Sequence, residues 1–363
     1  MDIRLMLEEA RDRGASDLIL VAGSAPAVRV DGAIHSFDGV GLLAAGDIET
    51  AFKELASAED VEEFYRELEL DFALSLDDGT RLRCNVSRQR GCTSLAIRLF
   101  PPHVPTIDEL ELPEVYKELV TRPRGLIIIT GPTGSGKSTS LAAMIEYLNL
   151  ISSKHIVTIE DPIEYVHRSN LSVISQRELG EDTHSFAQAL RHVLRQNPDV
   201  IMVGEVRDMD TAAAVLTVAE TGHLVLTTGH APSAPQALER IIDLFPLDER
   251  NLAQARLASL LVAVLCQTLV PRARGKGRIA AVEIMLASSA VRSLIRDGKF
   301  YQLPNIMRTG RDEGMVSMDM ALVELHLRGI ITRKTLFERC GDRDEVEELI
   351  ASTVTRPRRH SKG

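Results

Sequence analysis

Tryptophan is absent from this 363-residue chain, and aromatic residues together make up only 4% of it. Proteins that bind single-stranded nucleic acid stack the bases on aromatic side chains, so this composition argues against such a surface. The charge balance argues the same way, because 42 basic residues are outnumbered by 52 acidic ones and the formal net charge is −10. A surface of that sign repels nucleic acid on average. We therefore expect no nucleic-acid partner.

Cysteine is also scarce, and the four cysteines are scattered at Cys84, Cys92, Cys266 and Cys340 without a C-x-x-C pair. This spacing excludes the usual zinc ribbon and gives no disulfide framework. A chain without disulfides fits a reducing compartment. We expect neither zinc nor structural disulfides, and we expect a cytoplasmic protein.

Long hydrophobic runs are missing as well. The longest uncharged run, Leu257 to Pro271, is too short to span a bilayer and predicts a buried helix. The first residues, "MDIRLMLEEARDRG", are charged throughout and lack the apolar core of a signal peptide. Both observations predict a soluble, intracellular protein.

The length predicts two domains, and a change in sequence texture separates them. Residues 1–100 predict a small α+β domain, with an amphipathic helix over Met1 to Arg13 and a helical stretch over Leu43 to Leu68. Strand-like runs in the same domain turn at Asp31-Gly32 and at Asp78-Gly79. Residues 101–114 are rich in proline and acid and predict a linker.

Residues 115–351 have a different pattern, in which non-alternating apolar runs are separated by helical stretches. Such strands are buried on both faces, which predicts a mainly parallel sheet covered by helices. From about Arg272 the chain is predicted to be mostly helical. Residues 352–363 end in "TRPRRHSKG" and are expected to form a disordered basic tail.

One motif points directly to phosphate chemistry. The stretch "GLIIITGPTGSGKSTS" places G-x-x-x-x-G-K-[ST] between a predicted buried strand and a helix that begins near Lys137. Glycines let the backbone N–H groups point at a phosphate, and the helix N-terminus adds positive charge. Lys137 can reach the β- and γ-phosphates, and the Ser138 hydroxyl can bind Mg²⁺. The predicted ATP-binding residues are Gly131, Pro132, Thr133, Gly134, Ser135, Gly136, Lys137, Ser138 and Thr139.

Carboxylates follow two other predicted strands. Glu205 follows the run Val200 to Val203, and Glu160 and Asp161 end the run "HIVTIED", with Glu164 just beyond. The carboxyl ends of parallel strands meet at one edge of the sheet, which is where α/β folds bind ligands. We predict that Glu205 polarises an attacking water, and that the other carboxylates serve as metal or water ligands.

Two histidines, His223 and His230, flank the apolar run "LVLTT". On a helix they could share a metal ion. On a strand they would lie roughly 20 Å apart, which makes a shared metal site improbable. The strand interpretation is favoured by the surrounding pattern.

Taken together, these motifs resemble the secretion and pilus ATPase superfamily, and within it the type IV pilus retraction motors (PilT-like twitching motility ATPases). The resemblance covers nearly the whole chain. It includes "ASDLIL…RVDG", "RLRCN…AIRLFPP", "GPTGSGKST", "TIEDPIEY", "QNPDVIMVGEVRD", "AETGH", "ERIIDLFP" and "AVRSLIRDGK". The four-cysteine metal motif that extension motors and type II secretion ATPases carry after the histidine box is absent from the sequence.

The resemblance implies a PAS-like N-terminal domain and a RecA-like P-loop ATPase domain, so the expected fold class is α/β. It implies a Mg²⁺-dependent, hexameric ATPase at the cytoplasmic side of the inner membrane, which docks on a pilus platform protein and has a paralogous pilus ATPase as an optional partner. Its acidic box corresponds to Glu160, Asp161 and Glu164, and its Walker B glutamate to Glu205. Ser138, Glu164 and Glu205 are the implied metal ligands.

The resemblance also assigns roles outside this acidic set. Arg83 and Arg98 correspond to arginines that act on the nucleotide. His223 and His230 belong to the histidine box, with His230 implied as the sensor of the γ-phosphate and His223 as an organiser of structure or of the subunit interface.

The chain departs from the family pattern at three positions. Ile19 stands where the family has histidine, and Gly229 and Ala231 flank His230 where the family has "TLHT". The altered frame of His230 leaves open a weakly hydrolysing accessory subunit of a pilus motor. A related type II secretion or DNA-uptake ATPase is a further alternative.

Overall fold

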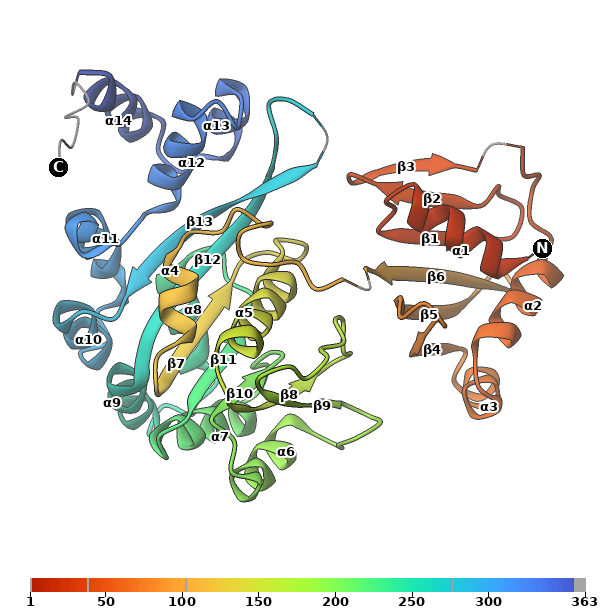
Figure 1. Ribbon diagram of the computed structural model, residues 1–363, viewed down its shortest axis with the longest axis horizontal. Helices are drawn as coiled ribbons and strands as arrows, with labels where there is room; N and C mark the ends of the chain where they lie inside the picture. Colours follow the sequence, from red (N-terminus) through yellow and green to blue (C-terminus); the bar gives the residue numbers. More distant parts are fainter. Residues whose placement is uncertain (1, 38, 102, 276, 356–363) are drawn as a thin grey trace. The chain divides into compact units, whose positions relative to one another are not determined.

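The computed structural model describes residues 2–37, 39–101, 103–275 and 277–355. The chain forms two compact units (Figure 1). The first consists of Met1–Val104 together with Pro162–Val166, and the second of Pro105–Asp161 and His167–Gly363. A short piece of the predicted acidic box therefore groups with the first unit.

The first unit contains an antiparallel sheet in the order β3-β2-β1-β6-β5-β4 within its described residues. The strands are β1 (Asp17–Leu20), β2 (Ala27–Val30), β3 (Ala33–Ser36), β4 (Glu69–Ser75), β5 (Arg81–Gln89) and β6 (Cys92–Phe100). The helices are α1 (Ile3–Asp12), α2 (Ala45–Leu55) and α3 (Ala58–Glu67). Alternate residues such as Leu18, Leu82 and Ile97 are buried against these helices, which is the period-2 pattern of a half-covered sheet.

The local predictions for this unit hold, with one refinement. The helix at the start and the turns at Asp31-Gly32 and Asp78-Gly79 are present. The predicted helical stretch is divided into α2 and α3, because Ser57 caps a new helix. Its hydroxyl accepts a hydrogen bond from the Asp60 amide, and the Asp60 carboxylate accepts one from the Ser57 amide, which is a capping box.

The second unit is built on a seven-stranded sheet in the order β13-β12-β7-β11-β10-β8-β9 in the described part of the chain. Its strands are β7 (Gly125–Thr130), β8 (His155–Glu160), β9 (Val173–Glu178), β10 (Val200–Val203), β11 (Leu224–Thr228), β12 (Leu261–Pro271) and β13 (Arg278–Leu286). All neighbours are parallel except the hairpin of β12 and β13. The predicted mainly parallel sheet is confirmed.

Helices and short 3-10 turns surround this sheet. They are α4 (Val115–Val120), α5 (Lys137–Ile151), α6 (Phe186–Val193), η1 (Leu194–Gln196), α7 (Met209–Glu220), α8 (Ala234–Asp243), α9 (Arg250–Leu260), α10 (Ser289–Arg296), η2 (Phe300–Gln302), α11 (Leu303–Thr309), η3 (Gly310–Glu313), α12 (Met318–Leu327), α13 (Arg333–Arg339) and α14 (Arg343–Thr355). Among the residues described, no helix combines the length and the apolar character that crossing a membrane requires.

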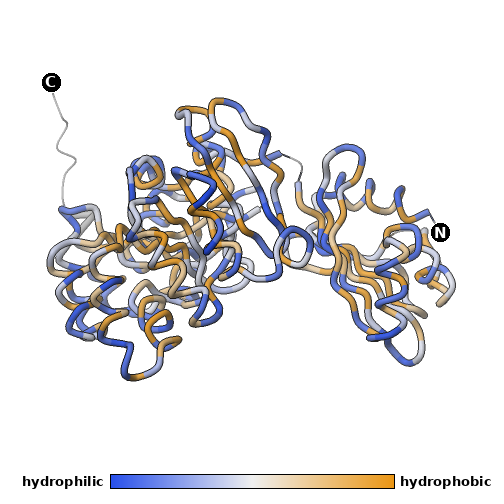
Figure 2. Tube along the Cα trace, turned by 90° about the horizontal axis from the view of Figure 1, so that it is seen from below, coloured by the Kyte–Doolittle hydropathy of each residue, from blue (hydrophilic) through white to orange (hydrophobic). Residues whose placement is uncertain are grey.

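The central strand β7 explains why the apolar runs do not alternate. Leu126 and Ile128 pack into one core with α6, α7, α8 and α9, whereas Ile127 and Ile129 pack into another with α4 and α5. Both faces are therefore covered, and every residue of the strand is buried. Figure 2 shows the apolar residues gathered in the interior of each unit.

The prediction of a buried helix over Leu257 to Pro271 is wrong. Helix α9 ends at Leu260, and the rest of the run forms β12 beside β7. A fully buried strand has apolar residues on both faces, so periodicity cannot distinguish it from a buried helix. The mostly helical region expected from Arg272 is also interrupted, since β13 returns antiparallel to β12 before the helices begin.

The last helices pack on the far end of the β12–β13 hairpin, where Val270 and Ile279 join a small core with α12, α13 and α14. Helix α14 continues to Thr355, which lies inside the segment 352–363 that was expected to be disordered. The remainder of that predicted tail, residues 356–363, lies outside the described residues.

Glu283 on β13 joins the starts of two helices. Its Oε1 accepts a hydrogen bond of 2.7 Å from the amide of Ala234, the first residue of α8. Its carboxylate also accepts a hydrogen bond from the amide of Met318, the first residue of α12. The residue is buried, and burial raises the pKa of its carboxyl group although both amides favour the charged form.

Replacing Glu283 by alanine removes the acceptor of both helix-terminal amides. We expect Glu283→Ala to lower the free energy of unfolding by about 2–6 kcal/mol, because two amides lose their acceptor and each unsatisfied buried amide costs about 1–3 kcal/mol. Urea unfolding measures the change. The control is Glu324→Ala on α12, whose side chain is 67% exposed, and which should stay within about 0.5 kcal/mol of the unsubstituted chain. Equal losses in the two variants would contradict this role of Glu283.

Candidate functional site

The phosphate loop connects β7 to α5. Strand β7 ends at Thr130, the loop runs from Gly131 to Gly136, and α5 begins at Lys137. Gly134 and Gly136 have φ angles of 76° and 88°, in the left-handed region that glycine adopts without strain. The predicted strand–loop–helix arrangement is therefore present.

Gly131 is required for a different reason. A Cβ atom built at this position would lie 2.3 Å from the carbonyl oxygen of Gln267 on β12 and 2.7 Å from the hydroxyl of Ser135. The loop thus packs its backbone directly against the neighbouring strand. Ser135 is itself buried, and its hydroxyl has no hydrogen-bond partner within the described residues.

Lys137, the first residue of α5, folds back onto the phosphate loop. The Lys137 ammonium group donates hydrogen bonds of 2.9 Å to the Gly131 carbonyl and 3.1 Å to the Pro132 carbonyl. Pro132 and Thr133 are exposed, and Ser138 is half-buried at the start of α5. Lys137 therefore sits against the loop that is predicted to hold the phosphates, as the motif requires.

Three other strands bring their ends to the same edge. The parallel register pairs β7 with β11, β11 with β10, and β10 with β8. The Gly229 amide donates to the Ile129 carbonyl at 2.9 Å, and the Gly204 amide donates to the Ile159 carbonyl at 2.7 Å. The residues that directly follow these strands are therefore held side by side by backbone pairing.

A cluster of charged side chains stands at this edge. Arg207 forms an ion pair with Glu205 and a second one, of 3.1 Å, with Asp161. His230 Nε2 lies 3.3 Å from the other oxygen of Glu205. Glu205 is the most sheltered member, with a side chain only 12% exposed. The structure thus brings together three of the predicted residues: Arg207 binds Asp161 and Glu205, and His230 lies against Glu205.

The electrostatics of the cluster favour a neutral imidazole. Partial burial lowers the pKa of His230, and the nearby Lys137 charge lowers it further, while Glu205 opposes both effects. The pKa of Arg207 is raised, mainly by its hydrogen bond to Glu205. His230 can therefore act as a neutral hydrogen-bonding group between the phosphate loop and Glu205.

The other two predicted acids, Glu160 and Glu164, have different surroundings. Glu160 is buried, and its Oε1 accepts hydrogen bonds from the Thr158 hydroxyl at 2.6 Å and from Gln176 Nε2 at 3.0 Å. Glu164 lies in Pro162–Val166, the segment that groups with the first unit. There Arg81 donates to the Ile163 carbonyl at 3.2 Å.

Arg83 and Arg98 are neighbours in the first unit. They are directly paired across β5 and β6, on the face of the sheet opposite the buried core. Arg98 Nε donates to Asp17 Oδ1 at 3.0 Å, and Arg29 Nε lies 3.5 Å from the other oxygen of Asp17. The two predicted arginines thus belong to a basic row that crosses several strands.

His223 and His230 lie at opposite ends of β11. His223 Nδ1 is 3.1 Å from the Val218 carbonyl and 3.0 Å from the Thr221 hydroxyl, at the end of α7. This places His223 at the edge of the sheet away from the phosphate loop. The two histidines cannot share a metal ion in this arrangement.

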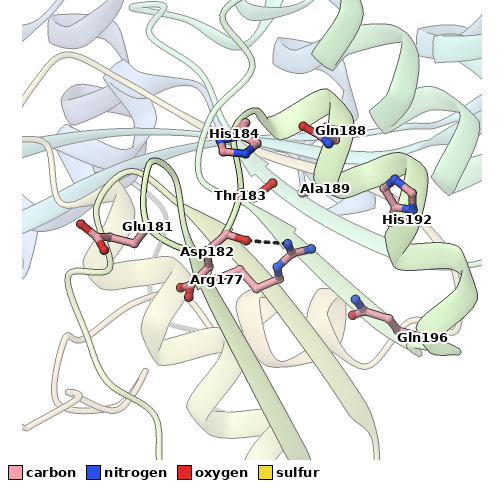
Figure 3. Close-up of a pocket in the computed structure, with 9 residues that line it drawn as sticks. All are labelled: Arg177, Glu181, Asp182, Thr183, His184, Gln188, Ala189, His192 and Gln196. Carbon is pink, nitrogen blue, oxygen red and sulfur yellow. Dashed lines mark hydrogen bonds between the residues drawn. The ribbon is translucent and has the colours of Figure 1, made fainter.

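Two cavities accompany the sheet of the second unit. One, of about 110 Å³, lies beside the cluster and is lined by residues that include His230, Arg207 and Arg240. The other, of about 330 Å³, lies between the end of β9 and α6 (Figure 3). It is lined by Arg177, Glu181, Asp182, Thr183, His184, Gln188, Ala189, His192 and Gln196, none of which is a predicted nucleotide-site residue.

Some neighbours of the cluster were not singled out from the sequence. Arg207 stands in the motif "GEVRD", two positions after Glu205. This short separation in the sequence is a signal that Arg207 lies near Glu205. Arg240 donates to the His230 carbonyl at 2.8 Å, and the Thr130 hydroxyl bonds to the backbone of Ala231. The second contact joins residues 101 positions apart in the sequence, so no local pattern could predict it.

Comparison with known proteins identifies the protein family. The pattern of the family described as "Type II/IV secretion system protein" matches residues 3–334. The chain belongs to this family. It is 41% identical over 339 residues to the type IV pilus retractation ATPase PilT of Pseudomonas aeruginosa, covering 93% of this chain and 98% of that protein. It is 40% identical over 348 residues to the type IV pilus ATPase PilU of the same species, covering 96% and 90%.

Solved structures agree. The crystal structure of the pilus retraction motor PilT with bound ADP matches with a TM-score of 0.85 and 40% identity, over 96% of this chain and 99% of that one. The ATPase DotB of Legionella pneumophila matches with a TM-score of 0.81 and 26% identity, over 93% and 94%. The predicted resemblance to pilus retraction ATPases and the predicted α/β fold class are therefore confirmed.

The packing of Gly131 gives a direct test of the loop. In Gly131→Ala the new methyl group meets the Gln267 carbonyl and forces the loop away from β12, so we expect nucleotide affinity to fall at least about tenfold. The measurement is titration with a fluorescent ADP analogue. Gly134→Ala is the control, because a Cβ there meets nothing within 4 Å, and only its left-handed backbone costs about 1 kcal/mol. A Gly131→Ala variant that binds as tightly as Gly134→Ala would contradict the packing argument.

Proposed function

We propose that this chain is a Mg²⁺-dependent ATPase motor that powers retraction of type IV pili. The observation that carries the proposal is the edge of the parallel sheet where the phosphate loop, Glu205 and His230 meet. Similarity to PilT over nearly the full length of both chains supports the motor role rather than a general nucleotide-binding role.

In this proposal the chain's own residues perform the chemistry of hydrolysis. The N–H groups of the loop and the Lys137 ammonium hold the β- and γ-phosphates of ATP. Glu205 orients the attacking water and accepts its proton. His230, held 3.3 Å from Glu205, contacts the γ-phosphate and couples its presence to the orientation of Glu205.

The donor set fits Mg²⁺. The residues proposed to hold it, Ser138, Glu164 and Glu205, offer only oxygen atoms, which are the ligands that Mg²⁺ prefers. In the described part of the chain no three histidine, cysteine or acidic side chains gather as a metal cage. When bound, Mg²⁺ would offset the charge of the phosphates.

Arg83 and Arg98 are proposed to complete the site in a ring of six subunits. A guanidinium group stabilises the charge that develops on a transferred phosphoryl group, as arginine fingers do. The pairing of both arginines on one exposed sheet face gives them a common direction. Closure of the two units around ATP, followed by opening after hydrolysis, would then supply the mechanical step.

The remaining assignments rest on the family. We propose that the motor works in the cytoplasm at the inner membrane, where it docks on the pilus platform protein, and that a paralogous pilus ATPase is a further partner. Asp161 and Glu160 support the site, the first through Arg207 and the second through Thr158 and Gln176.

A second candidate function is an accessory subunit that binds ATP and hydrolyses it weakly. The observation in its favour is the frame of His230, in which Gly229 and Ala231 replace the residues usual in the family. The similarity to PilU is nearly as high as the similarity to PilT. Tight ATP binding with negligible turnover in the purified chain would favour this candidate.

The role of Glu205 gives the test of the motor proposal. Glu205→Gln removes the proton acceptor and keeps the shape of the side chain, so we expect unchanged ATP affinity and a loss of turnover of at least about 100-fold. Steady-state phosphate release and nucleotide titration measure the two quantities. Glu338→Gln, on the exposed part of α13, should leave both unchanged. Hydrolysis by Glu205→Gln at a near-normal rate would overturn the assignment.

A further inference from the structure

A single hydroxyl group joins the phosphate-loop strand to the histidine loop. Thr130 is the last residue of β7 and is fully buried. Its hydroxyl donates a hydrogen bond of 3.0 Å to the Ala231 carbonyl and accepts one of 2.9 Å from the Ala231 amide. A threonine hydroxyl can do both at once, since it carries one donor hydrogen and two acceptor lone pairs. Both polar backbone groups of Ala231 are therefore bound by one side chain.

The two residues in this contact occupy special positions. Thr130 directly precedes Gly131, where the phosphate loop begins, and Ala231 directly follows His230. The imidazole of His230 in turn lies 3.3 Å from Glu205. The hydroxyl thus connects the start of the phosphate loop to the group that faces the proposed water-activating glutamate.

The small residues on either side of His230 fit this contact. A Cβ at Gly229 would lie 3.4 Å from the Thr130 hydroxyl oxygen and 3.7 Å from its Cβ, which is ordinary van der Waals contact, so residue 229 lies directly beside Thr130. Ala231 is buried, with 4% of its surface exposed. Its amide would be left without a partner if the hydroxyl were removed, which is costly in a buried place.

We propose that Thr130 is a positioning residue, whose hydroxyl holds the His230 loop at a fixed place beside the phosphate loop and so sets the alignment of His230 with Glu205. This inference rests on the proposed function, because it assigns the alignment a consequence for ATP hydrolysis. The contact involves the backbone of Ala231, one of the positions at which the chain departs from the family pattern.

The test compares two substitutions of the same shape. Thr130→Val replaces the hydroxyl of Thr130 by a methyl group and keeps the branched shape of the side chain. Thr227→Val makes the same change on the adjacent strand β11, where the Thr227 hydroxyl is buried and has no hydrogen-bond partner among the described residues. Thr130→Ser keeps the hydroxyl and loses only the methyl group. All three are compared with the unsubstituted full-length chain.

The expected result separates kcat from ATP affinity. In Thr130→Val, kcat falls at least about tenfold, as loss of a buried hydrogen-bond partner implies, while ATP affinity changes less than about threefold because the loop is intact. Thr130→Ser and Thr227→Val keep kcat within about twofold of the unsubstituted chain. An unchanged kcat in Thr130→Val overturns the proposal, and so does an equal loss in Thr227→Val or in Thr130→Ser.

Hydrogen exchange keeps this test independent of folding defects and of the proposed function. In the unsubstituted chain, peptides covering residues 229–233 should show a protected Ala231 amide, and Thr130→Ser should keep that protection. Rapid exchange of this amide in the unsubstituted chain overturns the proposal even if Thr130→Val does not fold. If the unsubstituted chain binds ATP without hydrolysing it, the motor proposal fails. The positioning role of Thr130 is still supported in that case if the Ala231 amide loses its protection in Thr130→Val and keeps it in Thr130→Ser.

Discussion

The parallel pairing of β7, β11, β10 and β8 is the constraint on which the site depends. Parallel strands all end at the same edge of their sheet, so segments far apart in the sequence deliver their next residues to one place. Burial of these strands on both faces fixes the register, because a shift of one residue would move apolar side chains between two different cores. The phosphate loop, Glu205 and His230 are adjacent for that reason.

Charge pairing then organises the edge. Asp161 and Glu205 are two carboxylates at neighbouring strand ends, and Arg207 binds both. A guanidinium group between two acids relieves their repulsion, and its planar fork suits carboxylates. His230 reaches the second oxygen of Glu205 and has a lowered pKa, so it adds a hydrogen bond to the cluster without a full positive charge. The general base proposed for hydrolysis is thus held from two sides.

The parts of the fold that follow from local chemistry could be predicted from the sequence. The phosphate loop, the strand ends at Glu160 and Glu205 and the strand between the two histidines were all placed correctly, because glycine spacing and buried apolar runs are local signals. The run that ends in β12 was assigned to the wrong element, since a strand buried on both faces has no periodicity to read.

Tertiary contacts could not be predicted in this way. The hydroxyl of Thr130 meets Ala231 only because β7 and β11 are neighbours, and Glu283 meets two helix starts only because β13 turns back along β12. Arg207 is an intermediate case. Its position two residues after Glu205 can be read from the sequence, whereas its ion pair with Asp161 depends on the order of the strands. Such contacts depend on strand order, which the pattern of one sequence does not specify.

The measurement that tests the account most directly is ATP hydrolysis by the purified full-length chain and by its Lys137→Ala variant in the presence of Mg²⁺. Lys137 lies against the phosphate loop, where its ammonium group bonds to the Gly131 and Pro132 carbonyls, and the motif assigns it to the phosphates. We expect steady hydrolysis by the unsubstituted chain and its loss in the variant. Hydrolysis that persists without Lys137, or an unsubstituted chain that binds ATP and never hydrolyses it, would contradict the account.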